Sequence, residues 1–343
     1  MSSISTSRHL LTSLTRIADF DSVHFDVVPK VREEWDTGDY VLGEVIGMVG
    51  PSNQLELTNG RMMTPMVGDT VVGALGIRAA TLEAVGHWQD VGEDGVLDCM
   101  TSAGLLGRIT SRSHYVGSVV QLKYRGHVVR NDSKVTMSQF VPSIDPQVEF
   151  NCPCVLIIGT SMSSGKTTSG RVLVRKLVES GLRVVGAKLT GAGRYRDVQA
   201  YYDSGASAIF DFVDCGLPST VCSEEVYSKS LGILLGQIAA ESPDVVVVEA
   251  GASPLEPYNG DTAVQRIQPH VRCTILCASD PYAVVGVTQG FGFQPDLVTG
   301  VATSTSAGCQ VVEGLTGLRA LNLMDPNSHD ELVQLLKAKL GIQ

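Results

Sequence analysis

The pattern of hydrophobic and polar residues changes near residue 145. Before that point, short segments of alternating apolar and polar residues are separated by turn residues such as Asn59-Gly60. Alternation of this kind is typical of half-buried β-strands, and Asn-Gly is typical of hairpin turns. The strand-like segments are 40–47, 54–57, 70–75, 116–124 and 127–130. We therefore expect residues 1–145 to form a smaller, mostly β domain, barrel-like in shape, with one short helix near 79–84 and a role in binding a substrate or partner.

Beyond this domain, strand-like and helix-like segments alternate. Pro142 and Pro146 lie in a stretch without periodicity, which marks a linker. Buried-strand patterns lie at 155–158, 183–189, 208–213, 245–248, 273–278, 297–301 and 318–323, and helical patterns at 166–180, 198–204, 224–241 and 330–340. This alternation predicts an α/β fold, a three-layer α/β/α domain with a mostly parallel sheet over residues 146–343. Ligands of such sheets bind beyond the carboxyl ends of the strands.

The amino-acid composition argues against some classes of binding partner. The 343 residues are 43% hydrophobic, which is typical of a globular chain long enough for two domains. A net charge of −10 argues against nucleic acid, because a phosphate backbone needs a basic surface. No apolar run reaches the ~18 residues of a membrane span, so we expect no membrane partner.

The N-terminal residues and the cysteines indicate in which cellular compartment the protein is expected. Residues 1–20 are rich in Ser and Thr and include Arg8 and Arg16, but Asp19 and Asp21 follow and no cleavage site of small residues is visible. We expect a short helix or loose tail there, and a cytoplasmic protein. The eight cysteines lack zinc-site spacing, so we expect buried, reduced thiols.

The segment 155–171 carries the strongest chemical signal. Four apolar residues precede a loop of glycine and serine residues, and Lys166 and Thr167 begin an amphipathic run. This order of strand, Gly-rich loop, Lys-Thr and helix is typical of a phosphate-binding loop, whose backbone N–H groups surround phosphate oxygens at a helix N-terminus. Lys166 would reach the β- and γ-phosphates, and the Thr167 hydroxyl would ligate Mg²⁺. We expect ATP and Mg²⁺ to be bound by Gly159, Thr160, Ser161, Ser163, Ser164, Gly165, Lys166, Thr167 and Thr168.

The spacing of this loop carries a family resemblance. Five residues separate Gly159 from Gly165, one more than in the common form. The loop thereby resembles the Gly-Thr-x-x-x-x-Gly-Lys-Thr loop of dethiobiotin synthetase, in the SIMIBI class of P-loop NTPases. The resemblance runs from Cys152 to the C-terminus, and the N-terminal domain has no recognised relative.

Basic residues follow the second predicted strand of the C-terminal domain. Lys188 ends that strand, where dethiobiotin synthetase carries a functional lysine, and would bind the transferred phosphate or a substrate carboxylate. Arg194 and Arg196 lie in the next loop and would clamp an anionic substrate or stabilise charge during transfer. In the N-terminal domain, Arg78, Arg108 and Arg112 lie among small residues, which suits either anion binding or solvated turns.

Acidic residues follow three other predicted strands. Glu249 ends an all-valine strand in the Walker B position, again resembling dethiobiotin synthetase. Asp214 follows the third strand and would hold Mg²⁺ together with Thr167 and Glu249. Ser253 and Asp280 would line the substrate side. The residues expected to take part in catalysis are Lys166, Lys188, Arg194 and Glu249.

The resemblance implies Mg-ATP-dependent phosphoryl transfer to a small carboxylate or amino-acid-like metabolite, by a kinase or by a ligase that forms an acyl phosphate. Three alternatives stay open. One is an amino-acid N-acetyltransferase resembling the D-glutamate N-acetyltransferases, with coenzyme A in the loop. Another is an NTPase switch or metal-insertion chaperone, and the third is a non-catalytic ATP sensor. The guanine-reading motif Asn-Lys-x-Asp is absent at 301–305, which favours adenine. By analogy with the class we expect a homodimer.

Overall fold

Residues 9–47, 53–144, 148–251 and 256–342 are described by the computed structural model. They belong to two units. The first unit comprises Met1–Pro142, Ala192–Arg196 and Phe212–Val221, and the second comprises Ser143–Gly191, Asp197–Asp211 and Cys222–Gln343. Two short segments of the C-terminal half of the chain therefore belong to the first unit.

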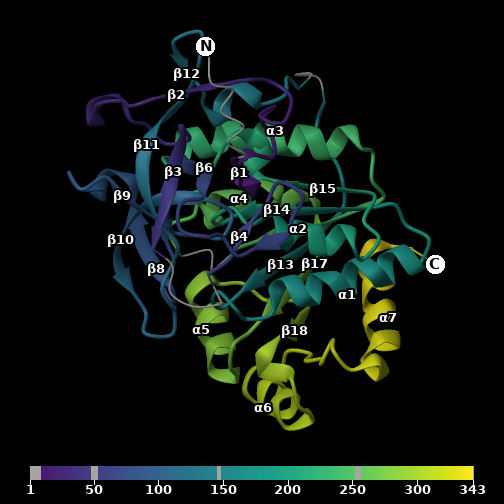
Figure 1. Ribbon diagram of the computed structural model, residues 1–343. Coiled ribbons are helices and arrows are strands. Elements are labelled where there is room, and N and C mark those ends of the chain that lie inside the picture. The colour runs from purple at the N-terminus through teal and green to yellow at the C-terminus, as the bar shows by residue number, and fades with distance from the viewer. Residues whose placement is uncertain (1–8, 48–52, 145–147, 252–255, 343) are drawn as a thin grey trace, which may run out of the picture. The chain divides into compact units, whose positions relative to one another are not determined.

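A closed ring of strands forms the centre of the first unit (Figure 1). Five strands share it, in the order β6 (Thr70–Leu75), β3 (Tyr40–Gly47), β11 (Gln121–Arg130), β9 (Val96–Cys99) and β10 (Leu105–Arg112). The pairing of β10 with β6 is parallel and closes the ring, whereas the other four pairings are antiparallel. Inward-facing apolar residues such as Val71, Leu97 and Leu122 form one buried cluster. The expected mostly β, barrel-like N-terminal part is confirmed.

Shorter elements surround this ring. The remaining strands of the first unit are β1 (Leu10–Leu11), β2 (Asp26–Val28), β4 (Leu55–Glu56), β5 (Met62–Met63), β7 (Ile77–Ala79), β8 (Ala84–His87) and β12 (Ser133–Lys134). The helix expected near 79–84 is wrong, because β7 and β8 form an antiparallel hairpin there. The Ala80 N–H donates to Ala84 O across the turn, and Leu82 is exposed, so this segment has no apolar helical face to bury.

The second unit contains a six-stranded sheet whose pairings are all parallel. The order across the sheet is β15 (Ala208–Asp211), β14 (Val184–Thr190), β16 (Val245–Ala250), β13 (Cys154–Gly159), β17 (Val271–Cys277) and β18 (Leu297–Thr299). The central strands β13 and β16 are buried along their whole length, as the apolar runs 155–158 and 245–248 predict. The strand expected at 318–323 is wrong, because only an isolated bridge between Val298 and Ala320 forms there.

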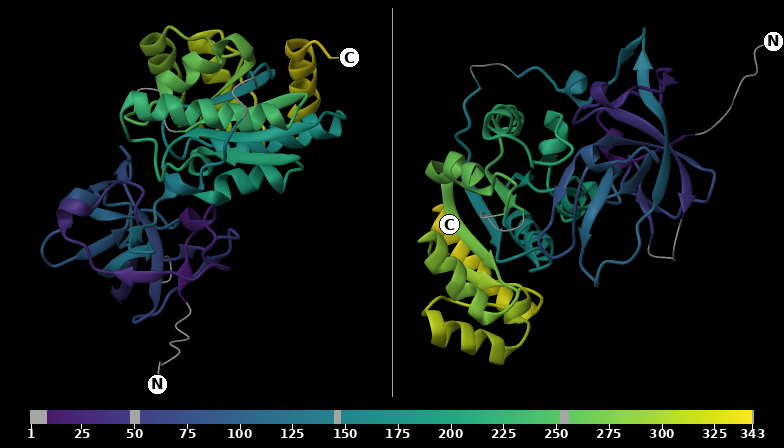
Figure 2. Two further views of the ribbon diagram at one scale, coloured as in Figure 1. Left: turned by 90° about the horizontal axis from the view of Figure 1, so that it is seen from above. Right: turned by 90° about the vertical axis from the view of Figure 1, so that its left-hand side faces the viewer.

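Helices cover both faces of this sheet, which confirms the expected three-layer α/β/α fold (Figure 2). The α-helices of the described residues are α1 (Lys166–Glu179), α2 (Tyr195–Tyr202), α3 (Glu224–Ala240), α4 (Gly260–Ile267), α5 (Pro281–Phe291), α6 (Ser306–Thr316) and α7 (His329–Leu340). α1 and α7 share one core cluster with β13 and β16, whereas α3 and α4 pack together against β14. In the described part of the chain, no helix has both the length and the hydropathy to cross a bilayer.

Candidate functional site

The loop between β13 and α1 has a backbone that its small residues make possible. Ser163 and Gly165 have positive φ values of 49° and 99°. A Cβ atom at Gly165 would lie 3.2 Å from Gly300 Cα, in a conformation that other residues rarely adopt. The Thr160 N–H donates to Cys277 O at 3.0 Å, so the loop is also anchored to the end of β17. The loop is therefore held in shape before any ligand binds.

Lys166, the first residue of α1, folds back over this loop. Its side chain is buried, and Nζ donates to Ser161 O at 2.8 Å. A Cβ atom at Gly159 would lie only 2.7 Å from Nζ, so glycine is what lets the lysine pass. Burial lowers the pKa of Lys166, and the negative charge of Glu249 opposes that shift. A buried ammonium whose pKa is lowered in this way would be stabilised by an anion in the loop.

Glu249 lies beside the loop at the carboxyl end of β16. In the sheet register it pairs with Ile157 of β13, and its side chain is buried. Its Oε2 accepts a hydrogen bond from Thr167 Oγ1 at 3.3 Å. A hydroxyl and a carboxylate form the hard-oxygen donor set that Mg²⁺ prefers, with phosphate and water completing its shell. Thr167 and Glu249 therefore fit the ion, although the described residues contain no group of three or more His, Cys, Asp or Glu side chains placed to hold a metal ion.

Tyr201 of α2 is a site residue that the sequence reasoning missed. Its hydroxyl donates to Glu249 Oε2 at 2.9 Å, and the ring is fully buried. Burial, followed by the charge of Glu249, raises the pKa of Tyr201 well above its ordinary value, so the phenol stays protonated and remains a donor. Gly170 of α1 and Gly186 of β14 make room for it, since a Cβ atom on either would come within 2.7 Å of Tyr201. No local pattern in the sequence points to Tyr201, because these glycines and Glu249 lie on other elements of the fold.

Lys188 lies on β14, one strand further from the loop. It pairs in register with Glu249 and is buried, and its ammonium forms an ion pair with Asp197 of α2. Its positive charge contributes to lowering the pKa of Lys166. The second unit thus brings together Lys166, Thr167, Lys188 and Glu249 at the carboxyl ends of three adjacent strands.

The other sequence-derived candidates lie elsewhere. Asp280 caps α5, where its Oδ1 accepts from the N–H groups of Tyr282 and Ala283, both at 3.0 Å. Ser253 lies outside the described residues. Three candidates, Asp214, Arg194 and Arg196, belong to the first unit.

In the first unit these three residues have polar surroundings of their own. Asp214 accepts a 2.9 Å hydrogen bond from Arg16, and Arg194 pairs with Glu83 at 3.3 Å. Arg196 lines the same cavity as Arg194. Their roles in metal and substrate binding stay predictions.

Comparison with known proteins returns structural similarity at low identity. Chloroplast FtsY from Physcomitrella patens is 13% identical over 58% of this chain and 70% of its own, with a TM-score of 0.37. A DUF1611 family protein from Anabaena variabilis is 14% identical over 58% of this chain and 63% of its own, with a TM-score of 0.36. HypB from Helicobacter pylori, in complex with nickel, is 15% identical over 56% of this chain and 88% of its own, with a TM-score of 0.36. No protein-family model and no curated protein matches the sequence.

Proposed function

We propose that the second unit binds Mg-ATP at residues 159–168 and transfers its γ-phosphoryl group to a small carboxylate or amino-acid-like metabolite. The observation that supports this most strongly is the arrangement around Glu249. Its carboxylate contacts Thr167, which directly follows the buried Lys166 at the N-terminus of α1. A cation, a hydroxyl and carboxylate pair suited to Mg²⁺, and a helix N-terminus thus lie at one loop, and these groups suit a nucleoside triphosphate.

Each residue has a role set by its chemistry. On binding, Lys166 would exchange its hydrogen bond to Ser161 O for phosphate oxygens and neutralise part of their charge. Thr167 and Glu249 would hold Mg²⁺, which when bound offsets the negative charge of the phosphates. Lys188, in register with Glu249, would supply a second cation to the transferred group or to the acceptor carboxylate. Phosphoryl transfer needs little covalent chemistry from the protein, so positioning and charge account for most of the catalysis.

The acceptor decides which product forms. A carboxylate acceptor gives an acyl phosphate, which an amine can attack to complete a ligase reaction, whereas a hydroxyl acceptor gives a stable phosphoester. Adenine is proposed as the base because β18 is followed by Val301-Ala302-Thr303-Ser304-Thr305 and lacks the guanine-reading Asn-Lys-x-Asp.

Calorimetric titration of ATP, GTP and acetyl-coenzyme A, each with and without Mg²⁺, tests the proposal. Lys166→Ala is the test variant, and Lys176→Ala is its control, because Lys176 lies on the same helix and pairs with Glu179 at the surface. We expect Mg²⁺-dependent ATP binding that Lys166→Ala abolishes and Lys176→Ala leaves intact. A screen of amino and carboxylic acids for ADP release would then identify the acceptor.

Three outcomes would replace this proposal. Preference for GTP would favour an NTPase switch. Binding of coenzyme A without dependence on Mg²⁺ would favour an acetyltransferase whose loop holds the phosphates of that cofactor. ATP binding that never leads to ADP release with any acceptor would favour a sensor.

A further inference from the structure

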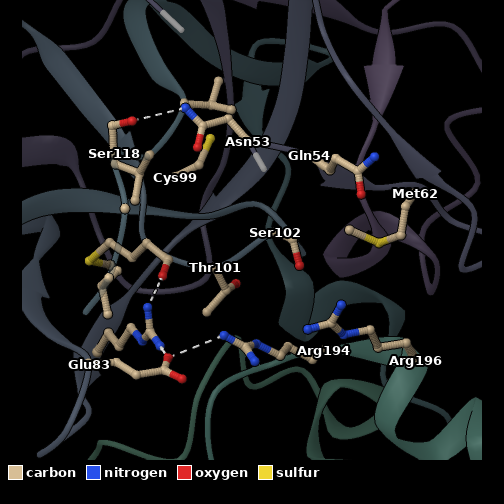
Figure 3. Close-up of a pocket in the computed structure, with 16 residues that line it drawn as sticks. Asn53, Gln54, Met62, Glu83, Cys99, Thr101, Ser102, Ser118, Arg194 and Arg196 are labelled. Carbon is tan, nitrogen blue, oxygen red and sulfur yellow. Dashed lines mark hydrogen bonds and ion pairs between the residues drawn. The ribbon is translucent and has the colours of Figure 1, made fainter. Parts of the chain in front are cut away.

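The first unit contains a cavity of its own, with a volume of about 390 Å³ (Figure 3). The described residues that line it all belong to the first unit, including two from the short segment 192–196. A volume of roughly 300–1,000 Å³ is typical of pockets for small molecules. The neutral polar side chains on its walls include Asn53, Gln54, Thr101, Ser102 and Ser118. The cavity is therefore large enough for a metabolite and offers it several hydrogen-bonding groups.

The charged groups of the cavity are unequal in number. Among the described residues that line it are three guanidinium groups, those of Arg78, Arg194 and Arg196, and one carboxylate, that of Glu83. Glu83 Oε2 accepts from both Arg78 and Arg194, so one acid serves two arginines (Figure 3). Arg78 is almost fully buried and also donates to Met100 O. Among the described lining side chains, positive charges exceed negative charges by two, which favours an anionic ligand.

Buried contacts hold the backbone that carries Arg194 and Arg196. Glu56 is fully buried, and its carboxylate accepts from the Tyr195 N–H at 2.8 Å and the Arg196 N–H at 2.9 Å. Thr101 Oγ1 donates to Gly193 O at 3.3 Å. Both guanidinium groups therefore project from a backbone that is fixed before a ligand arrives, which lowers the entropic cost of binding.

We propose that this cavity binds a small metabolite with two carboxylate groups, recognised by Arg194 and Arg196. A guanidinium matches the two oxygens of a carboxylate in a bidentate geometry, and two negative charges equal the positive excess of the cavity. The hydroxyl and amide side chains would bind the remaining polar groups of the ligand. This binding site does not depend on phosphoryl transfer by the second unit.

Calorimetry on the full chain without nucleotide tests the proposal, with succinate as the probe. Succinamide, a neutral molecule of nearly the same size, and inorganic phosphate are the comparison ligands. The test variants are Arg194→Gln and Arg196→Gln, and the control is Arg175→Gln, an exposed arginine of α1. We expect succinate to bind, to bind more weakly at higher salt, and to lose about tenfold or more in affinity with either test variant but not with the control.

Several results would overturn the proposal. They are no succinate binding up to about 10 mM, equal binding of succinamide, binding of phosphate alone, or unchanged succinate affinity in both test variants. Thermal unfolding of each variant separates lost binding from lost folding. Because Lys166→Ala tests nucleotide binding and succinate tests the cavity, failure of one proposal leaves the other standing.

Discussion

The hydroxyl of Tyr201 donates a 2.9 Å hydrogen bond to the same Glu249 oxygen that contacts Thr167. Tyr201 thus orients a carboxylate without itself lying on the loop. Residues that orient a metal-binding carboxylate usually affect metal affinity as strongly as some of the ligands do.

Tyr201→Phe should therefore weaken Mg²⁺-dependent nucleotide binding by about tenfold and leave Mg²⁺-independent binding unchanged. It should also cost about 1 kcal/mol of stability, because Glu249 loses a buried hydrogen bond. Nucleotide titrations across Mg²⁺ concentrations measure the first effect, and thermal unfolding measures the second. Tyr202→Phe, at an exposed neighbouring position, is the control. An unaltered Mg²⁺ dependence would show that Tyr201 only fills space.

Two helix glycines give a matched pair. Gly170→Ala places a Cβ atom 2.5 Å from the Tyr201 ring, whereas Gly232→Ala on α3 meets nothing within 4 Å. We expect Gly170→Ala to destabilise the protein by about 1–3 kcal/mol through overpacking. Gly232→Ala should stabilise it by up to about 1 kcal/mol through helix propensity. Urea unfolding measures both, and equal effects would contradict the packing argument.

Glu249→Gln keeps an oxygen near Thr167 and removes the charge. In the presence of Mg²⁺, we expect this variant to bind nucleotide about tenfold or more weakly than the wild type, because an amide is a poor magnesium ligand. Most of the affinity gained from Mg²⁺ would then be lost. Nucleotide titration with and without chelator is the measurement. A variant that retains the full effect of Mg²⁺ would place the ion elsewhere.

The lowered pKa of Lys166 has a consequence for stability. Burial penalises its charged form in the folded state, and the penalty is complete at pH values below the folded pKa. It is relieved as the pH rises from the folded pKa toward the ordinary value of 10.5, because the folded protein releases the proton first. Lys166→Met should therefore raise the melting temperature of the nucleotide-free protein at pH 7, and this advantage should shrink toward pH 10. Differential scanning calorimetry at both pH values tests the sign, and an advantage that grows with pH would refute it.

Glu56 gives a prediction for the cavity in the first unit. Its carboxylate also accepts from the Ser13 hydroxyl, so Glu56→Ala leaves three donors without their acceptor. We expect a loss of about 2–4 kcal/mol in unfolding free energy, together with weaker succinate binding. Glu44→Ala is the control, because its pair with Arg125 is exposed and is worth at most about 1 kcal/mol. Chemical unfolding of both variants makes the comparison.

Local signals in the sequence predicted much of this structure. The continuous apolar runs of β13 and β16 identified buried parallel strands, and the loop before Lys166 stood out by its composition. The helical pattern at 224–241 predicted α3, whose observed end at Ala240 lies one residue from the expected one. These features depend on neighbours in sequence, and so the sequence was enough to find them.

Contacts between distant residues could not be predicted in this way. Nothing local indicates that β6 and β10 pair in parallel to close a barrel, or that Tyr201 reaches Glu249. Because Arg194 follows β14, the sequence predicts that it binds an anionic substrate or stabilises charge during transfer. Its ion-pair partner Glu83 lies 111 positions earlier in the chain and could not be predicted. Partners that far apart are brought together only by the fold.

The discontinuous course of the first unit has a consequence for how the protein is made. The ribosome synthesises residues 192–196 and 212–221 well after the last strand of the barrel. During synthesis, the carboxylate of Glu56 therefore lacks its two backbone donors until residues 195 and 196 have been added. Assembly of the barrel unit is thereby coupled to translation of the α/β half, and a nascent chain that ends at residue 145 would lack Arg194 and Arg196 of its own cavity.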